Sequence, residues 1–136
     1  MRCSNCDSTV VSFLLDQTLR THAPTDADAI GLCPRCLTLQ ELDDPTSVSD
    51  TPSFNRISES FPDGKTAPPT ALLLGLLDSL ALNRSSIETL IERIEAEGTD
   101  PLLLLDRLAN QGSVAPRWDV DRRRHQLEQL LERQDF

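Results

Sequence analysis

The sequence predicts an α+β fold, with short antiparallel strands in the first third of the chain and a four-helix α domain in the last part. Residues 1–42 contain short apolar runs that are typical of strands. Residues 70–136 hold sixteen leucines and three isoleucines, which recur at helical spacing. Residues 43–69 hold five of the nine prolines and no leucine, a composition that buries too little apolar surface to fold alone. We therefore predict two folded parts joined by a linker.

Three short strands are expected in residues 1–42. Apolar runs at 10–15, 29–32 and 37–39 have the length and the β-branched or aliphatic content of strands. The segment 21–28 contains one proline and two aspartates, which predicts an exposed loop. A cysteine pair precedes the first run and another separates the second run from the third, so each pair is expected at a turn.

The two cysteine pairs carry the most specific signal in the chain. Cys3 and Cys6 form one Cys-x-x-Cys pair, and Cys33 and Cys36 form the other. Four thiolates complete a tetrahedral zinc site, because a two-residue spacer lets both sulfurs of a pair reach one ion at about 2.3 Å. A part of this size cannot rely on its core alone, and bound metal supplies on the order of 10 kcal/mol of folding free energy in zinc-finger peptides. The sequence thus predicts a zinc ribbon over residues 1–42 with one structural Zn²⁺.

The same four cysteines are compatible with other chemistry. Two disulfides would require an oxidising compartment, and a thioredoxin-like pair would have to open a helix after a strand. Iron or an iron–sulfur cluster uses the same ligands as zinc, and His22 could replace one cysteine. We favour zinc held by the four cysteines. Because protein ligands then fill every coordination position, the metal is expected to be non-catalytic.

Four helices are predicted from periodicity and capping residues, over 70–82, 85–97, 100–111 and from 119 onward. Thr70 is expected to cap the first, and Ser85 with Glu88 has the spacing of a capping box for the second. Asp100 followed by Pro101 is a typical start for the third. The fourth is expected to turn these residues inward: Val120, Leu127, Leu130, Leu131 and Gln134. Short connections between the helices favour a small bundle.

The predicted first helix is apolar on nearly all sides. A helix of this kind is central or lies at an interface. We expect Leu72, Leu76 and Leu80 to contact a partner, either a second copy of the chain or another protein. The alternative is that these leucines are buried within the monomer.

The linker contains three apolar side chains at helical spacing. Phe54, Ile57 and Phe61 would share one side of a short helix, and the turn at 62–64 would follow it. Such a helix would dock on a neighbouring part of the chain. The alternative is a disordered strap that carries three apolar residues.

The charge of the chain restricts its partners. With 22 acidic and 13 basic side chains the formal charge is −9, and aromatic residues make up 4% of the chain. The charge argues against nucleic-acid or anionic-membrane binding, and the scarcity of aromatic residues argues against a base-stacking surface. One basic cluster interrupts this pattern: Arg117, Trp118, Arg122, Arg123 and Arg124. These residues could bind an acidic partner or phosphates, or the arginines could pair internally while Trp118 closes the bundle.

Composition also indicates a setting. No run approaches the roughly 18 to 20 apolar residues that span a bilayer, and the N-terminus lacks the apolar segment of a signal peptide. We expect a cytoplasmic protein with no membrane partner. Lys65 is the single lysine against twelve arginines, and this balance together with the acidic excess suits a protein kept soluble in strong salt.

Two motifs give the chain a family resemblance. Cys33-Pro34-Arg35-Cys36 and Cys3-Ser4-Asn5-Cys6 resemble the small haloarchaeal zinc-finger proteins named for a Cys-Pro-x-Cys-Gly signature. The turn at 61–64 before the leucine run at 71–77 resembles, more specifically, an uncharacterised haloarchaeal family that joins such a ribbon to a leucine-rich helical part. The resemblance implies a zinc ribbon and a salt-rich habitat, and no activity.

The chain departs from this signature after each cysteine pair. Asp7 follows Cys6, and Leu37 follows Cys36 where the signature has glycine. A positive φ is often required at this position of a cysteine turn. Aspartate tolerates such a conformation and leucine does not, so the second turn is expected to deviate from the usual geometry.

No group of residues typical of catalysis emerges from the sequence. The five glycines are scattered and there is no Gly-x-Ser-x-Gly motif, so we expect neither enzymatic activity nor a small-molecule substrate. The expected function is a protein-interaction adaptor or scaffold. The alternative is a nucleic-acid-associated regulator of transcription or translation that uses the ribbon and the Arg117–Arg124 cluster.

Overall fold

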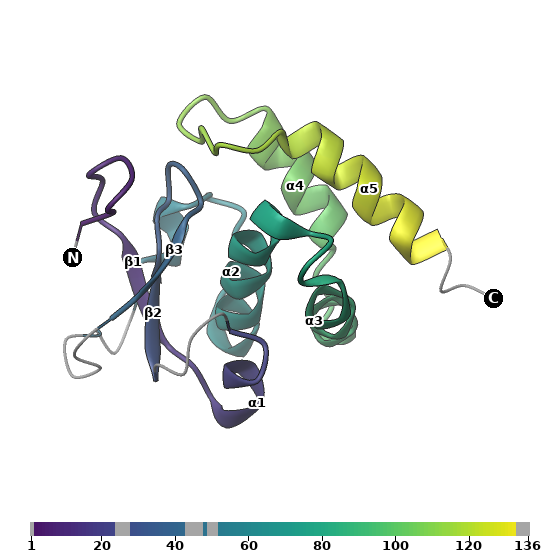
Figure 1. Cartoon of the computed structure of the whole chain (residues 1–136), viewed down its shortest axis with the longest axis horizontal. Coiled ribbons are helices and arrows are strands. Elements are labelled where there is room, and N and C mark those ends of the chain that lie inside the picture. Colours follow the sequence, from purple (N-terminus) through teal and green to yellow (C-terminus); the bar gives the residue numbers. More distant parts are fainter. Residues whose placement is uncertain (1, 24–27, 43–47, 49–51, 133–136) are drawn as a thin grey trace.

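The computed structural model describes residues 2–23, 28–42, 48 and 52–132 of the chain. Within these residues the fold is α+β, with a three-stranded antiparallel sheet at one end and helices stacked beside it (Figure 1). The strands are β1 (Val11–Leu14), β2 (Ala29–Leu32) and β3 (Leu39–Glu41), in the order β1-β2-β3. Phe13 pairs with Ile30, and Leu32 pairs with Leu39. The predicted antiparallel strands at the N-terminus are confirmed.

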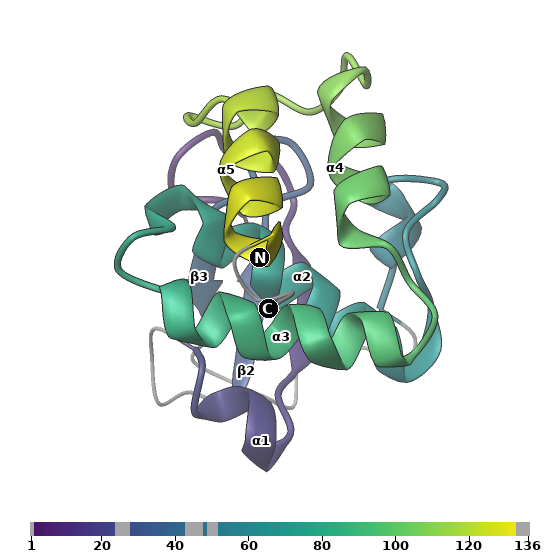
Figure 2. The same cartoon turned by 90° about the vertical axis from the view of Figure 1, so that its right-hand side faces the viewer.

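The helical part differs in detail from the prediction. The described residues form α1 (Gln17–Arg20), α2 (Ala67–Leu76), α3 (Arg84–Ala96), α4 (Pro101–Ala109) and α5 (Val120–Glu132). Short 3₁₀ helices add η2 (Phe54–Arg56), η3 (Gly64–Thr66) and η4 (Leu77–Ser79). The predicted four-helix count is therefore not exact, because α1 is an additional single turn and the first predicted helix ends in η4. In Figure 2, α4 and α5 run side by side, and α3 runs crosswise below them.

The start of α2 corrects the prediction of a cap at Thr70. The helix begins at Ala67, and Pro68 and Pro69 occupy its first turn. Amide groups at these positions have no partner within a helix, so proline is tolerated there. Thr70 lies inside the helix, where its hydroxyl donates to the carbonyl of Thr66 at 2.8 Å. The paired prolines thus open the helix instead of ending a linker.

The predicted cap at Asp100 and the predicted start of the fourth helix near Asp119 are both confirmed. Asp100 accepts hydrogen bonds from the amides of Leu102 and Leu103 at 3.0 and 3.2 Å at the start of α4. Asp119 accepts from the amide of Arg122 at 3.1 Å at the start of α5. The predicted inward residue Gln134 lies outside the described residues.

The capping box predicted at Ser85 is wrong. α3 begins one residue earlier, at Arg84, and no side-chain cap forms. Asn83 precedes the helix, and its amide group donates backward to the carbonyls of Leu76 and Ser79 at 3.2 and 3.0 Å. This residue therefore closes the preceding turn, so Ser85 falls within α3.

In addition to a small buried cluster of Val10 and the cysteines, one large hydrophobic core runs through the described parts of the chain. It includes Phe13 and Ile30 from the sheet, Leu73 from α2 and Leu127 from α5, each at most 1% exposed. The central segment contributes as well, because Ile57 is fully buried. Phe54 stacks on Phe61 at 5.6 Å between ring centroids and lies 5.5 Å from Phe13. The segment that resembles a linker in composition therefore packs against the sheet.

Gly75 marks the closest approach of α2 to the sheet. A Cβ atom at Gly75 would overlap Cγ and Cδ1 of Leu39 on β3. We expect Gly75→Ala to lower the free energy of unfolding by about 1–2 kcal/mol, because displacement of Leu39 outweighs the gain in helix propensity. Urea unfolding of Gly112→Ala is the control, since a Cβ at Gly112 meets nothing within 4 Å. Equal stability of the two variants would contradict the close packing.

Asp16 links the sheet region to the helices. Its carboxylate accepts from the amide of Leu19 at 2.8 Å and from the hydroxyl of Thr18 at 2.6 Å, and it pairs with Arg93 of α3 at 3.0 Å. The hydrogen bond from Thr18 is the main cause that lowers the pKa of Asp16 to about 2; burial opposes the shift and Arg93 supports it.

A carboxyl group whose pKa is lowered by folding stabilises the fold above its unfolded pKa of about 3.9. This contribution is lost as the pH falls from about 4 toward 2. Because half of the Asp16 side chain is exposed, we expect Asp16→Asn to lower the free energy of unfolding by only about 0.5–1 kcal/mol at pH 7. Urea unfolding of both proteins should show this difference shrinking with acidity, and a constant difference would contradict the assignment.

Candidate metal centre

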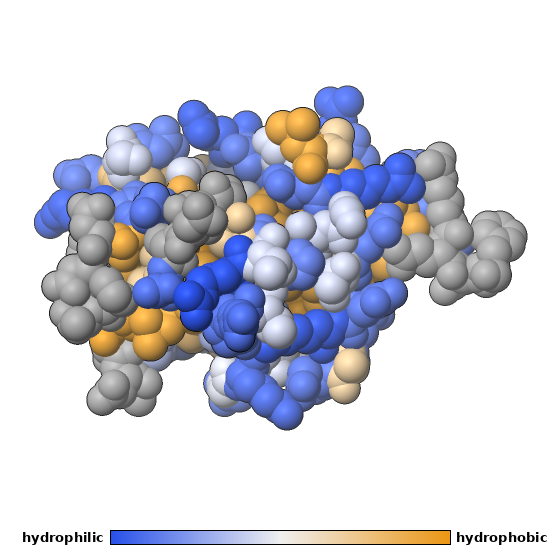
Figure 3. Space-filling model, turned by 60° about the horizontal axis from the view of Figure 1, so that its bottom comes forward, coloured by the Kyte–Doolittle hydropathy of each residue, from blue (hydrophilic) through white to orange (hydrophobic). Residues whose placement is uncertain are grey.

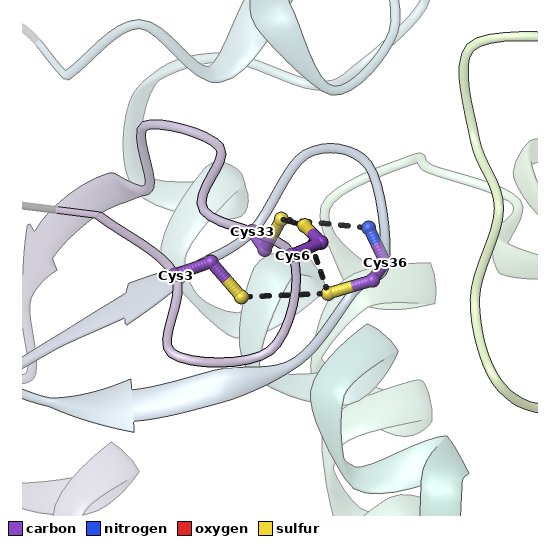
Figure 4. Close-up of side chains that lie close together, drawn as sticks. All are labelled: Cys3, Cys6, Cys33 and Cys36. Atoms are coloured by element: carbon purple, nitrogen blue, oxygen red, sulfur yellow. Dashed lines mark hydrogen bonds between the residues drawn. The ribbon is translucent and has the colours of Figure 1, made fainter.

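Two turns of similar geometry hold the four cysteines, and we call them the first and second knuckle. The first knuckle is residues 3–8, enclosed by an isolated antiparallel bridge between Arg2 and Thr9. The second is residues 33–38, which connect β2 to β3. Figure 4 shows the side chains of both knuckles converging on one point between them.

The sulfur atoms have the spacing of a tetrahedral metal site. Cys6 Sγ lies 3.3 Å from Cys33 Sγ and 3.7 Å from Cys36 Sγ, and Cys3 Sγ lies 3.5 Å from Cys36 Sγ. All four sulfurs lie within 4.8 Å of one another. Four sulfurs at about 2.3 Å from one ion in a tetrahedron are about 3.8 Å apart. A disulfide would need about 2.05 Å, so all four cysteines are free and suit a shared metal ion.

The same pair of backbone hydrogen bonds closes each knuckle. The carbonyl of the first cysteine accepts a hydrogen bond from the amide of the residue directly after the second cysteine. The amide of the first cysteine donates to the carbonyl of the residue two positions after the second cysteine. These distances are 2.9 and 2.7 Å in the first knuckle and 2.9 and 3.0 Å in the second (Asp7 N to Cys3 O, Cys3 N to Ser8 O, Leu37 N to Cys33 O, Cys33 N to Thr38 O). The two pairs of ligands are thus presented in the same way.

Both knuckles place a residue other than glycine at positive φ. Asp7 has φ of 62° and Leu37 has φ of 57°. The expectation that leucine would distort the second turn is wrong. Leu37 is fully buried in the hydrophobic core, and burial of a leucine side chain, about 1.5–3 kcal/mol, outweighs a left-handed backbone cost of roughly 1–2 kcal/mol.

Burial and hydrogen bonding give the thiols different acidities. Burial raises the pKa of Cys33 to about 12. Burial opposes the ionisation of Cys36 as well, but hydrogen bonds from Thr38 and Asn5 outweigh it and lower the pKa of Cys36 to about 6. Hydrogen bonds with Ser8 lower the pKa of Cys6, which is the one half-exposed cysteine. Since metal ligation requires four thiolates, metal binding would release protons and weaken as the pH falls.

Two residues without any predicted role tie the knuckles to the rest of the protein. The side-chain amide of Gln40 on β3 donates to the carbonyl of Arg2 at 3.1 Å and accepts from the amide of Ser4 at 3.2 Å. The amide of Ala115, in the loop between α4 and α5, donates to the carbonyl of Arg35 at 2.6 Å. Neither glutamine nor alanine carries a sequence signal for such a role, so sequence reasoning missed both.

His22 lies apart from the cysteines. Its Nδ1 lies 3.0 Å from the hydroxyl of Ser86 on α3. The four-residue cluster that could hold an ion consists of cysteines alone. Within the described residues, His22 therefore joins the turn after α1 to α3.

The fold and the site define an α+β protein with a four-cysteine centre that is consistent with a zinc ribbon. The chain belongs to DUF6276, a family of unknown function, which it matches over residues 2–131. Comparison with curated proteins and with solved structures gave no match. The family therefore identifies the chain and assigns no activity.

The leucines predicted to contact a partner lie mainly inside the protein. Leu72 is fully buried and Leu76 is 2% exposed, while Leu80 is half-buried against the core. Packing of α2 between the sheet and α3 places the first two there. Of the three residues, Leu80 alone reaches the surface.

The basic cluster is divided between inward and outward residues. Trp118 is 8% exposed and belongs to the core. Arg123 donates to the carbonyl of Leu77 at 2.7 Å, and Arg124 pairs with Glu128 at 2.9 Å. Two members of the cluster are exposed, Arg117 and Arg122. Three of the five members (Trp118, Arg123 and Arg124) therefore support the fold, and Arg123 joins α5 to η4.

Proposed function

We propose that this protein binds one structural, non-catalytic zinc ion. One observation carries the proposal: four cysteine sulfurs from two similar knuckles lie within 4.8 Å of one another. Four thiolates in a tetrahedral arrangement suit zinc, which has no geometric preference of its own. Because the chain would supply every ligand, no coordination position is left for an activated water molecule.

We further propose that the metal-fixed fold acts as a protein-interaction adaptor or scaffold. Large apolar side chains remain exposed at Leu14, Leu82 and Leu103, at 54%, 87% and 47%. Figure 3 shows one face on which hydrophobic side chains form separate patches among hydrophilic ones. None of the described helices has the length and apolar character that a bilayer span requires. A partner protein could bury these exposed leucine side chains.

Elemental analysis of the purified full chain tests the metal proposal. We expect close to one zinc per chain, and we expect cobalt substitution to give the visible spectrum of a tetrahedral thiolate site. The proposal would be overturned if the purified protein contained no stoichiometric transition metal and also failed to take up added zinc or cobalt. If the purified protein instead contained iron and showed the absorption of an iron–sulfur cluster, the site would hold iron and not zinc.

A second candidate function is nucleic-acid association. The hydrogen bond between Ala115 and Arg35 brings the α4–α5 loop, which leads to Arg117, beside the second knuckle. Arg35 and Arg117 are both exposed. Titration of DNA and RNA at several salt concentrations separates the candidates, because phosphate contacts give a linear fall of log K with log salt. A protein-interaction adaptor is expected to bind neither DNA nor RNA at any salt concentration. A measurable slope of log K against log salt would favour the nucleic-acid-associated regulator.

A further inference from the structure

Each of the four sulfurs has a hydrogen-bonding group of the chain beside it. In both knuckles the sulfur of the first cysteine accepts from a backbone amide within the same knuckle. The two distances are both 3.4 Å (Asn5 N to Cys3 Sγ, Cys36 N to Cys33 Sγ). These contacts use the backbone, so they are independent of the side chains at these positions.

The sulfur of the second cysteine in each knuckle has a side-chain partner instead. Cys36 Sγ lies 3.1 Å from the hydroxyl of Thr38, and Cys6 Sγ lies 3.5 Å from the hydroxyl of Ser8. Both hydroxyl residues stand two positions after the second cysteine. Their own carbonyls accept the amide of the first cysteine at 3.0 and 2.7 Å. Each hydroxyl residue is thereby held by its backbone in a position from which its side chain meets the sulfur.

Metal binding would determine which group donates and which accepts in these two hydrogen bonds. Four thiolates on one divalent ion formally leave two negative charges at the centre. Charge that is buried without hydrogen-bond donors is costly. A metal-bound thiolate carries no proton, so in both contacts the hydroxyl must donate and the sulfur must accept.

We propose that Thr38 and Ser8 are positioning residues for the metal. Each hydroxyl donates to the thiolate of the second cysteine in its knuckle, orients that sulfur toward the ion and offsets part of its negative charge. This inference rests on the proposed metal function. Groups of this kind around a metal site typically change metal affinity by about 10- to 100-fold.

The two contacts differ in strength. Thr38 is closer to its sulfur, and Cys36 is 4% exposed. Ser8 is farther from its sulfur, and Cys6 is half-exposed. Hydrogen bonds are electrostatically stronger where water is excluded. Thr38 is therefore expected to have the larger effect on the metal.

The test compares the full-length zinc protein with Thr38→Val, which removes the hydroxyl at nearly constant shape, and with Thr38→Ser, which keeps it. We expect Thr38→Val to release zinc to an excess of a chromogenic chelator about 10- to 100-fold faster, and Thr38→Ser to stay within about twofold of wild type. In the cobalt forms, the sulfur-to-metal charge-transfer band of Thr38→Val should move to lower energy, because an unbonded thiolate is more easily oxidised. A purely structural role would not move this band.

Two results would overturn the inference. One is an unchanged release rate and charge-transfer band in Thr38→Val; the other is an equal effect of Thr38→Ser and Thr38→Val. If Thr38→Val holds no metal, Ser8→Ala carries the test, with a smaller shift in the same direction expected and no shift contradicting it. A wild-type chain that binds neither zinc nor cobalt would instead refute the metal function itself, so the two failures are distinguishable.

Discussion

Cys33→Ser is expected to unfold the whole described fold, and not residues 1–42 alone. Serine is a poor zinc ligand, and a structural zinc site contributes about 10 kcal/mol or more to folding. The net stability of a domain is about 5–15 kcal/mol. Loss of the ion therefore removes an amount comparable to the entire stability, unless the helices hold together without the sheet.

The packing indicates that the helices depend on the sheet. Leu37 of the second knuckle belongs to the same core as α2 and α5. Leu39 occupies the space beside Gly75 of α2, and Arg93 of α3 pairs with Asp16. Residues of the sheet and of the helices thus share one buried interior. Division into two folding units would require this interior to be split, which exposes apolar surface on both sides.

Far-UV circular dichroism and metal content, measured on the same sample, test this expectation. Cys33→Ser should lose both the metal and most of the helical signal. Ser4→Ala is the matched control, because Ser4 is exposed in the first knuckle and is not a metal ligand. Chelation of the ion from the wild-type chain should reproduce the effect of Cys33→Ser. A variant that loses metal and retains its helices would show that the two parts fold separately.

Local signals account for what the sequence predicted correctly. The cysteine site follows from the identity and spacing of Cys3, Cys6, Cys33 and Cys36, and two such pairs are sufficient to specify four ligands. Asp100 caps α4, as predicted, through hydrogen bonds to amides within three residues. Asp119, near which the fourth helix is predicted to begin, accepts a hydrogen bond from an amide three residues on. Interactions of such short range are readable from neighbouring residues alone.

Competing or distant contacts account for what the sequence could not predict. The spacing of Ser85 and Glu88 is that of a capping box, yet Asn83 closes the preceding turn and moves the helix start. The central segment has the composition of a linker, but the burial of Ile57 joins it to the core. Whether a few apolar residues find a partner depends on surfaces far away in the chain, and composition does not contain that information.

Leu37 and Asp7 offer a direct measure of how burial decides a backbone conformation. Both residues follow the second cysteine of a knuckle, at φ of 57° and 62°. Leu37 is fully buried, whereas Asp7 is exposed. Glycine at either position would remove the cost of the left-handed backbone, about 1–2 kcal/mol. The two substitutions therefore differ mainly in the side chain that is lost.

We expect Leu37→Gly to lower the free energy of unfolding by about 2–4 kcal/mol, because a buried leucine is worth more than the strain that glycine relieves. Asp7→Gly should be neutral or stabilising by up to about 1 kcal/mol, since no buried contact is lost. Both values come from urea unfolding at one fixed free zinc concentration, because bound metal adds to the apparent stability. If Leu37→Gly were as stable as Asp7→Gly, the side chain of Leu37 would not be what holds the second knuckle to the helices. The metal centre would then depend on the four sulfurs and their backbone hydrogen bonds alone.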